Sequence, residues 1–124
     1  IGKVVLALRP GRKDKNFIGI ADSVCKHFGA SLTLLHVVPE KGQKTETIKH
    51  RSEEKLTQYK VKANVEIIKS DKPVDTISEI SASYDLLILG TPEKDNWIKV
   101  LLGGGKDKFT ERAACSVLRI TLKD

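Results

Sequence analysis

The stretch that decides the fold is residues 90–120, GTPEKDNWIKVLLGGGKDKFTERAACSVLRI. The apolar run before it, residues 84–89, predicts a strand that ends at Gly90, and a short helix is predicted to reach about Ala114. Three consecutive glycines open that helix: Gly103, Gly104 and Gly105. Glycine lets backbone N–H groups approach a phosphate, and the unpaired N–H groups and dipole of a helix start favour negative charge. Strand, glycine loop and helix start therefore predict an anion site, although a triple glycine is also typical of a flexible turn.

In the rest of the chain, apolar runs of strand length alternate with helical patterns and short connections. Strands are predicted at residues 3–8, 31–38, 61–69, 84–89 and 116–122. Helices are predicted at residues 14–28, at residues 45–59, from Pro73 onward and after the three glycines. Continuous apolar strands are typical of a parallel sheet with helices on both faces. Residues 1–124 therefore predict one α/β domain, Rossmann-like, with a single open five-stranded parallel sheet.

The first predicted helix has a clear apolar stripe. Its members recur at helical spacing: Phe17, Ala21, Val24 and Phe28. Gly29 suits the position just after the helix end. We expect Cys25 beside this stripe, and Cys115 far from it in sequence, to be reduced, buried residues.

The decisive stretch also resembles the C-terminal signature of the universal stress protein family. That signature is a strand ending in glycine, then G-x2-G-x9-G-[ST], then a helix that ends near A-P-C-[PS]-V-L. Gly90 and Gly103 match its first and third glycines with the right spacing. Residues 113–118, AACSVL, keep the closing pattern, with Ala114 in place of proline.

The resemblance implies an adenine nucleotide alpha hydrolase-like fold whose fifth strand lies at a sheet edge and often pairs with a second copy. Leu118, Ile120 and Leu122 alternate with Val117, Arg119 and Thr121, which is typical of a half-exposed edge strand. We therefore predict a homodimer through the fifth strand.

Open parallel sheets bind ligands beyond the carboxyl ends of their strands, where the strand order reverses. By this rule the loop after the first strand and the loop after Gly90 face each other. The resemblance also implies that backbone groups at Val37 meet an adenine ring. The candidate ligand-binding residues are Arg9, Val37, Gly90, Gly103, Gly104, Gly105 and Lys106.

Three residues depart from the family pattern at this site. Arg9 stands where nucleotide-binding members have an aspartate, and a guanidinium cannot accept the hydrogen bonds that a carboxylate accepts. Glu93 replaces the second glycine, and Gly104 replaces the serine or threonine. Two alternatives follow: a phosphate-bearing ligand, such as ATP or another adenine nucleotide, or a degenerate site kept for its turn geometry.

Other function classes find no support in the sequence. The glycines form no Walker A loop, because Val100 and Asp107 stand at its required positions. No catalytic constellation can be argued from spacing, and His27, His36 and His50 have no metal-ligand spacing. His36 is interpreted as a structural filler of its strand.

The chain carries 22 Lys and Arg against 16 Asp and Glu, a formal net charge of +6. Much of the excess lies in residues 41–62, which fits a solvated helix face. Nucleic-acid binding would need aromatic residues among the basic ones, and this segment has only Tyr59. A nucleic-acid partner is therefore not expected, and attraction to an anionic membrane surface is the alternative.

Residues 95–102, DNWIKVLL, are unusually apolar and place Trp97 and three aliphatic residues on one helical face. They either cap the end of the sheet or form a docking patch. Together with Arg9 and Pro10, this cluster resembles the universal-stress-type domains appended to amino acid permeases and cation transporters. The chain starts at Ile1 and contains no methionine, which favours a fragment of a longer polypeptide.

We therefore expect a cytoplasmic regulatory or ligand-sensing domain without catalytic activity. In this interpretation it is the tail of an amino acid or cation transporter, contacts the transmembrane part, and has a degenerate nucleotide site. The competing expectation is a free-standing, ATP-binding universal stress protein, for which slow ATP hydrolysis stays open.

Overall fold

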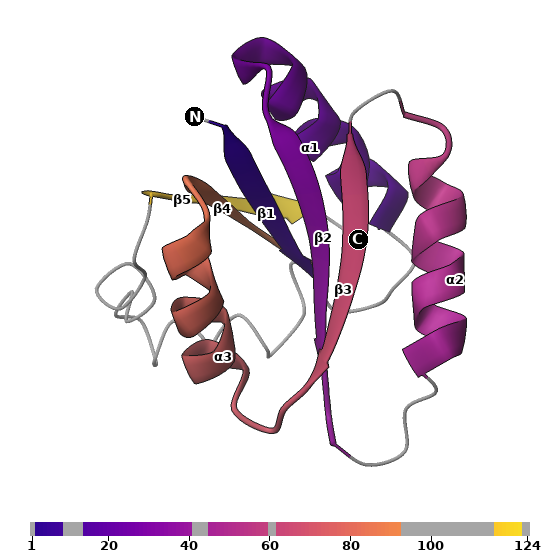
Figure 1. Ribbon diagram of the computed structural model, residues 1–124, viewed down its shortest axis with the longest axis vertical. Coiled ribbons are helices and arrows are strands. Elements are labelled where there is room, and N and C mark those ends of the chain that lie inside the picture. The colour runs from indigo at the N-terminus through magenta and orange to yellow at the C-terminus, as the bar shows by residue number, and fades with distance from the viewer. Residues whose placement is uncertain (1, 9–13, 41–44, 60–61, 93–115, 123–124) are drawn as a thin grey trace.

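The computed structural model describes residues 2–8, 14–40, 45–59, 62–92 and 116–122 (Figure 1). Strands and helices alternate along these ranges. The strands are β1 (Lys3–Leu8), β2 (Ser31–Val38), β3 (Ala63–Lys69), β4 (Leu86–Pro92) and β5 (Ser116–Leu122). The helices are α1 (Asp14–Phe28), α2 (Thr45–Leu56), α3 (Pro73–Ile80) and the short 3-10 helix η1 (Ser81–Ser83). Among the described residues, no helix is long and apolar enough to cross a membrane.

The five strands form one sheet in the order β3-β2-β1-β4-β5, and every neighbouring pair is parallel. The predicted fold class is therefore confirmed, with β5 at one edge and β3 at the other. From β1 the chain steps outward through β2 to β3, and then returns to β4 on the opposite side of β1. The strand order thus reverses between β1 and β4.

Helices cover both faces of the sheet. On one face α1 and α2 enclose a core that includes Phe17, Ile18 and Leu56 together with alternate residues of the strands. On the other face α3 contributes Ile77 to a second core. This division follows from the strand sequences, because a continuous apolar run supplies buried side chains to both faces of a sheet.

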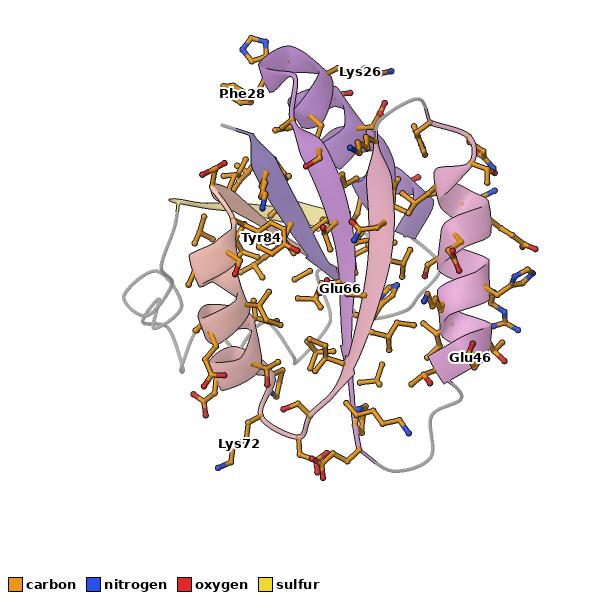
Figure 2. All side chains as sticks on the ribbon, viewed as in Figure 1. Lys26, Phe28, Glu46, Glu66, Lys72 and Tyr84 are labelled. Atoms are coloured by element: carbon orange, nitrogen blue, oxygen red, sulfur yellow. The ribbon has the colours of Figure 1, made fainter. Side chains whose placement is uncertain are left out.

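The stripe predicted for α1 loses burial toward the helix end. Phe17 and Ala21 are buried and Val24 is partly buried, whereas Phe28 is 46% exposed and projects from the helix end (Figure 2). The prediction for Phe28 is therefore wrong, because α1 ends there and the chain turns away. Gly29 has a φ of 64°, and the Ala30 N–H donates to the Cys25 carbonyl oxygen at 2.9 Å, which confirms the predicted glycine cap.

Strand β4 continues past the glycine at which the sequence predicted it would end. Residues 90–92 pair in register with residues 120–122 of β5, so the neighbouring strand extends the ladder. Helix α2 is shorter than the predicted residues 45–59: the Thr57 hydroxyl donates to the Glu54 carbonyl oxygen at 2.6 Å, in a turn that follows Leu56. Strand β3 begins two residues later than predicted, at Ala63.

The amino end of β1 is held by a carboxylate. Asp85 Oδ2 accepts hydrogen bonds from the backbone N–H groups of Gly2 at 2.8 Å and Lys3 at 2.9 Å. The Asp85 N–H in turn donates to the Lys3 carbonyl oxygen at 2.8 Å. The two backbone donors hold the pKa of the Asp85 carboxyl below its usual value, because they stabilise the charged form.

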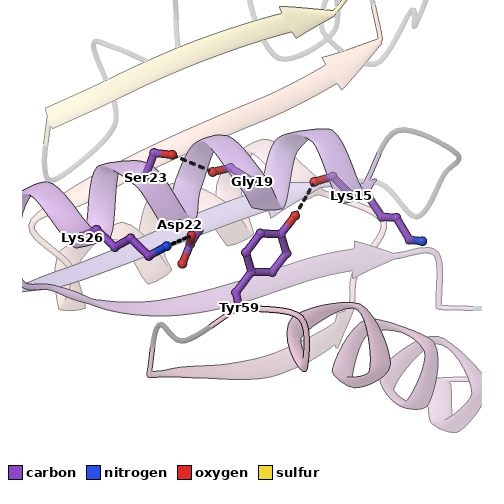
Figure 3. A network of polar contacts seen from close by, with 6 residues as sticks. All are labelled: Lys15, Gly19, Asp22, Ser23, Lys26 and Tyr59. Atoms are coloured by element: carbon purple, nitrogen blue, oxygen red, sulfur yellow. Dashed lines mark hydrogen bonds and ion pairs between the residues drawn. The ribbon is translucent and has the colours of Figure 1, made fainter.

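Polar contacts tie α1 to the connection between α2 and β3 (Figure 3). The Tyr59 hydroxyl donates to the Lys15 carbonyl oxygen at 3.3 Å.

Further along α1, Lys26 Nζ lies 3.0 Å from Asp22 Oδ2, and the Asp22 side chain is only 5% exposed. The other carboxylate oxygen of Asp22 is buried and has no hydrogen-bond partner in the part of the chain that the structure describes. Asp22 therefore depends on Lys26 for its charge balance.

Candidate functional site

The candidate site lies at the carboxyl edge of the sheet, where β1 and β4 lie side by side (Figure 1). Leu8, the last residue of β1, pairs in register with Gly90 of β4 on one side and with His36 of β2 on the other. Parallel strands end at the same edge, and ligands of such sheets bind where the strand order reverses. The structure therefore brings Gly90 and Val37 to the edge at which the sequence predicted a ligand.

Val37 contributes its backbone rather than its side chain to this edge. The side chain is 7% exposed and packs in the core on the α3 face. Beyond the pair Leu8–His36, Val37 and Val38 have register partners in β3, and the residues that follow Leu8 lie outside the described part of the chain. The Val37 backbone contact to a ligand stays a prediction.

Gly90 is required for a reason that the sequence interpretation missed. A Cβ atom at residue 90 would lie 2.6 Å from Leu8 Cδ2 and 2.7 Å from Phe17 Cδ1, far inside van der Waals contact. Among the described residues only Gly29 has a positive φ, so Gly90 does not serve an unusual backbone conformation. The glycine instead lets Phe17 of α1 pack directly on β4 next to the site.

The other predicted ligand-binding residues lie outside the described residues: Arg9, Gly103, Gly104, Gly105 and Lys106. The departures from the family pattern at Glu93 and Gly104, and the apolar residues 95–102, lie there too. The predictions for these residues therefore stay predictions from sequence. The structure places the carboxyl ends of β1 and β4, and the segments that contain these residues follow those two strands in the sequence.

His36 is the polar residue at this edge to which the sequence interpretation gave no function. Its side chain is fully buried, with Nδ1 3.1 Å from the Leu8 carbonyl oxygen and Nε2 2.9 Å from the Ser52 hydroxyl oxygen of α2. A histidine within the apolar run SLTLLHVV was itself a signal, because a buried polar side chain needs hydrogen-bond partners. The partners could not be read from the sequence, since they lie 28 and 16 residues away.

Metal and thiol chemistry find no support in the described part of the chain. No group of three His, Cys, Asp or Glu side chains there could hold a metal ion. Cys25 is a free, buried cysteine, as predicted, whereas Cys115 lies outside the described residues. Burial, together with the Asp22 carboxylate, raises the pKa of Cys25 to about 11, so the thiol stays protonated and unreactive near neutral pH.

Two surface hollows border β3 and α2, away from the site. Their volumes are about 590 and 380 Å³, and they share Lys49 and Val65 in their walls. Neither is lined by a residue of β1 or β4. The site at the reversal of strand order is therefore not formed by these hollows.

Comparison by sequence finds no matching protein-family model and no matching curated protein. Solved structures do match. A universal stress protein in complex with cAMP is 16% identical, with a TM-score of 0.74 over 97% of this chain and 96% of that chain. The universal stress protein from Archaeoglobus fulgidus in complex with dAMP is 11% identical, with a TM-score of 0.70 over 97% and 98%.

A universal stress protein family protein from Arabidopsis thaliana with AMP bound is 18% identical, with a TM-score of 0.65 over 98% of this chain and 92% of that chain. Another structure from Archaeoglobus fulgidus DSM 4304 matches 98% of this chain but only 44% of its own length, with a TM-score of 0.73 and 20% identity. The same arrangement thus also occurs within a longer chain. Over nearly its whole length, the protein has the fold of the universal stress proteins.

Proposed function

We propose that the carboxyl edge between β1 and β4 binds an adenine nucleotide, and that the domain senses this ligand rather than turning it over. The observation that carries the proposal is the register of Leu8 with Gly90 at the reversal of strand order, with the Val37 backbone beside it. Three structures of the same fold contain cAMP, dAMP or AMP, ligands that share adenine and a phosphate group.

Each part of the ligand is assigned to the residues whose chemistry suits it. The Val37 backbone offers hydrogen-bonding groups to the edge of an adenine ring, and the apolar strand ends offer surface for its faces. The glycines at 103–105 and Lys106 supply N–H groups and a positive charge for the phosphate. Arg9 then pairs with phosphate charge, which is the chemistry that a guanidinium offers in place of a carboxylate.

This proposal departs from the expectation of a degenerate site, which rested on Arg9, Glu93 and Gly104. A degenerate site and a site that uses Arg9 for phosphate make opposite predictions for Arg9→Asp. In a degenerate site, the aspartate restores a lost hydrogen-bond acceptor and binding improves. In a site that uses the guanidinium, the same change places a carboxylate beside the phosphate and binding weakens.

Calorimetric titration separates these outcomes. We expect AMP and ATP, with and without Mg²⁺, to bind the unchanged chain with a Kd on the order of micromolar, about −8 kcal/mol, and GTP to bind much more weakly. Arg9→Asp should weaken ATP binding more than AMP binding, because ATP carries more charge. No heat with any adenine nucleotide, or equal heats with GTP, would contradict the proposal.

A narrower possibility concerns the setting of the domain. The resemblance to domains appended to transporters leads us to propose, as the second candidate, a regulatory tail on the cytoplasmic side that contacts the transmembrane part. One solved structure of this fold is matched over only 44% of its own length, which is what a domain within a longer chain would give. This candidate with a degenerate site predicts no nucleotide heat in the unchanged chain and a gain of binding in Arg9→Asp.

Homodimerisation through β5 belongs to the same proposal. Strand β5 is at a sheet edge, and Leu118 on it is 41% exposed. An edge strand with an exposed apolar residue is a ready surface for a second copy. We expect a dimer in sedimentation equilibrium at tens of micromolar and a shift toward monomer in Leu118→Lys; a monomer in the unchanged chain would contradict this.

A further inference from the structure

A buried series of hydrogen bonds runs from α2 through His36 to the end of β1. Ser52 lies on α2, His36 on β2, and the Leu8 carbonyl group is the last of β1. Ser52 is 3% exposed and His36 is fully buried, so water has little access to these bonds. These hydrogen bonds therefore link the surface helix α2 to the last peptide group of β1, which precedes Arg9.

The Leu8 carbonyl group and the Ser52 hydroxyl lie against the two ring nitrogens of His36, and the carbonyl group fixes which nitrogen carries the hydrogen. A carbonyl oxygen can only accept, so Nδ1 carries the hydrogen and donates it to Leu8. With that tautomer the neutral ring has its lone pair on Nε2, which accepts from the Ser52 hydroxyl. The Leu8 carbonyl group thus selects the tautomer, and Ser52 holds the Nε2 side of the ring in place.

Helix α2 is polar, and its buried residues are Ser52 and Leu56. A polar surface helix with two buried residues is expected to open at a lower free-energy cost than the core strands. The Ser52–His36 hydrogen bond is a buried polar contact between α2 and the sheet.

We propose that His36 is a positioning residue that sets the carboxyl end of β1, and that Ser52 controls it from α2. Through this pair, the docking of α2 and the geometry of the strand ends beside Gly90 are coupled. The effect of this coupling on nucleotide affinity rests on the proposed function. The coupling of α2 to the end of β1 can be tested without ligand.

The ligand-free test measures, by NMR, the tautomer of the His36 imidazole and the ¹³C chemical shift of the Leu8 carbonyl group. Long-range ¹H–¹⁵N spectra should show His36 in the Nδ1–H tautomer. Ser52→Ala should keep this tautomer, because Leu8 selects it, but should change the Leu8 carbonyl ¹³C shift, because the ring loses its contact to α2. Ser81→Ala is the matched control, because Ser81 is also fully buried and its hydroxyl donates at 2.7 Å to the Ser78 carbonyl oxygen after α3. An Nε2–H tautomer in the unchanged chain would overturn the inference.

The ligand test uses a variant that no longer needs Ser52. The side-chain N–H₂ of His36→Asn can take the place of Nδ1–H and donate to Leu8 whatever α2 does. We expect Ser52→Ala to weaken AMP binding about 2- to 10-fold, the range that one net hydrogen bond gives. In the His36→Asn background the same change should have no effect, and Ser81→Ala should have none in either background.

Each remaining outcome also decides the question. If Ser52→Ala weakens AMP binding equally in both backgrounds, or no more than Ser81→Ala does, the inference is wrong. If the unchanged chain binds no adenine nucleotide, the proposed function fails, and the NMR result alone decides whether α2 controls the end of β1. If His36→Asn does not fold, the Leu8 carbonyl shift in Ser52→Ala compared with Ser81→Ala still decides it.

Discussion

A methyl group at residue 90 has no room, and its cost can be worked out from the structure. The added Cβ would lie 2.6 Å from Leu8 Cδ2, 2.7 Å from Phe17 Cδ1 and 2.8 Å from Phe17 Cγ. Optimal carbon–carbon contacts are about 3.5–4.0 Å, so the side chains must separate by about 1 Å. Both neighbours are almost fully buried and cannot swing into water. Overpacking of this kind costs about 1–3 kcal/mol, which we predict for Gly90→Ala.

Urea unfolding measures this cost, and we expect the midpoint of Gly90→Ala to fall by about 1 M, given typical slopes for small domains. Leu8→Ala removes the nearest clashing atom, so the Gly90→Ala cost should be smaller in that background. Gly19→Ala is the matched control: it lies within α1, where alanine is favoured, and among the described residues its Cβ meets the flexible end of one side chain, the Tyr59 hydroxyl at 3.3 Å. A Gly90→Ala chain as stable as the unchanged one, or costs that simply add with Leu8→Ala, would refute the reasoning.

Three further predictions concern charge and burial. Lys26→Ala should cost about 1–3 kcal/mol in urea unfolding, because it leaves the buried Asp22 carboxylate without its cation, and most of this loss should vanish in an Asp22→Asn background. Asp85 has a lowered pKa, so its stabilisation is full above the unfolded-state value of about 3.9 and is lost as pH falls through the folded-state pKa. The Tm difference between the unchanged chain and Asp85→Asn should therefore shrink in acid, and a constant difference would contradict this. In a Cys115→Ser chain, alkylation of Cys25 at pH 8 should occur only at the rate of unfolding, since the thiol is buried and protonated; fast native-state labelling would show otherwise.

Local pattern was enough to predict most of the architecture. Continuous apolar runs that alternate with helical stripes indicate a parallel sheet, and the bounds of β1, α1 and β2 match the predicted residues. The structure departs from the predicted bounds and burial where the surrounding fold, rather than the local sequence, determines them. β4 extends through residues 90–92 because β5 pairs with them, and Phe28 is exposed because α1 ends before the sheet can cover it.

For the candidate site, the position of Gly90 in the sheet was predictable but its packing was not. The glycine spacing placed Gly90 near the carboxyl end of its strand, where the structure pairs it with Leu8, yet nothing in the sequence indicated its steric role. Its steric role depends on Phe17, which lies 73 positions earlier and meets β4 only in the folded chain. The same holds for His36, whose function as a link depends on the register of β1 with β2 and on the rotation of α2.

The measurement that tests the central claim most directly is a titration of ¹⁵N-labelled protein with AMP, followed residue by residue. The proposal predicts that the amide shifts with the largest changes cluster at the carboxyl edge, at Leu8, Val37 and Gly90 and in the loops that follow. Gly2 and Asp85, at the opposite edge, should not move. Shifts that cluster at the amino edge or along the hollows between α2 and β3, or no shifts at millimolar AMP, would contradict a nucleotide site between β1 and β4.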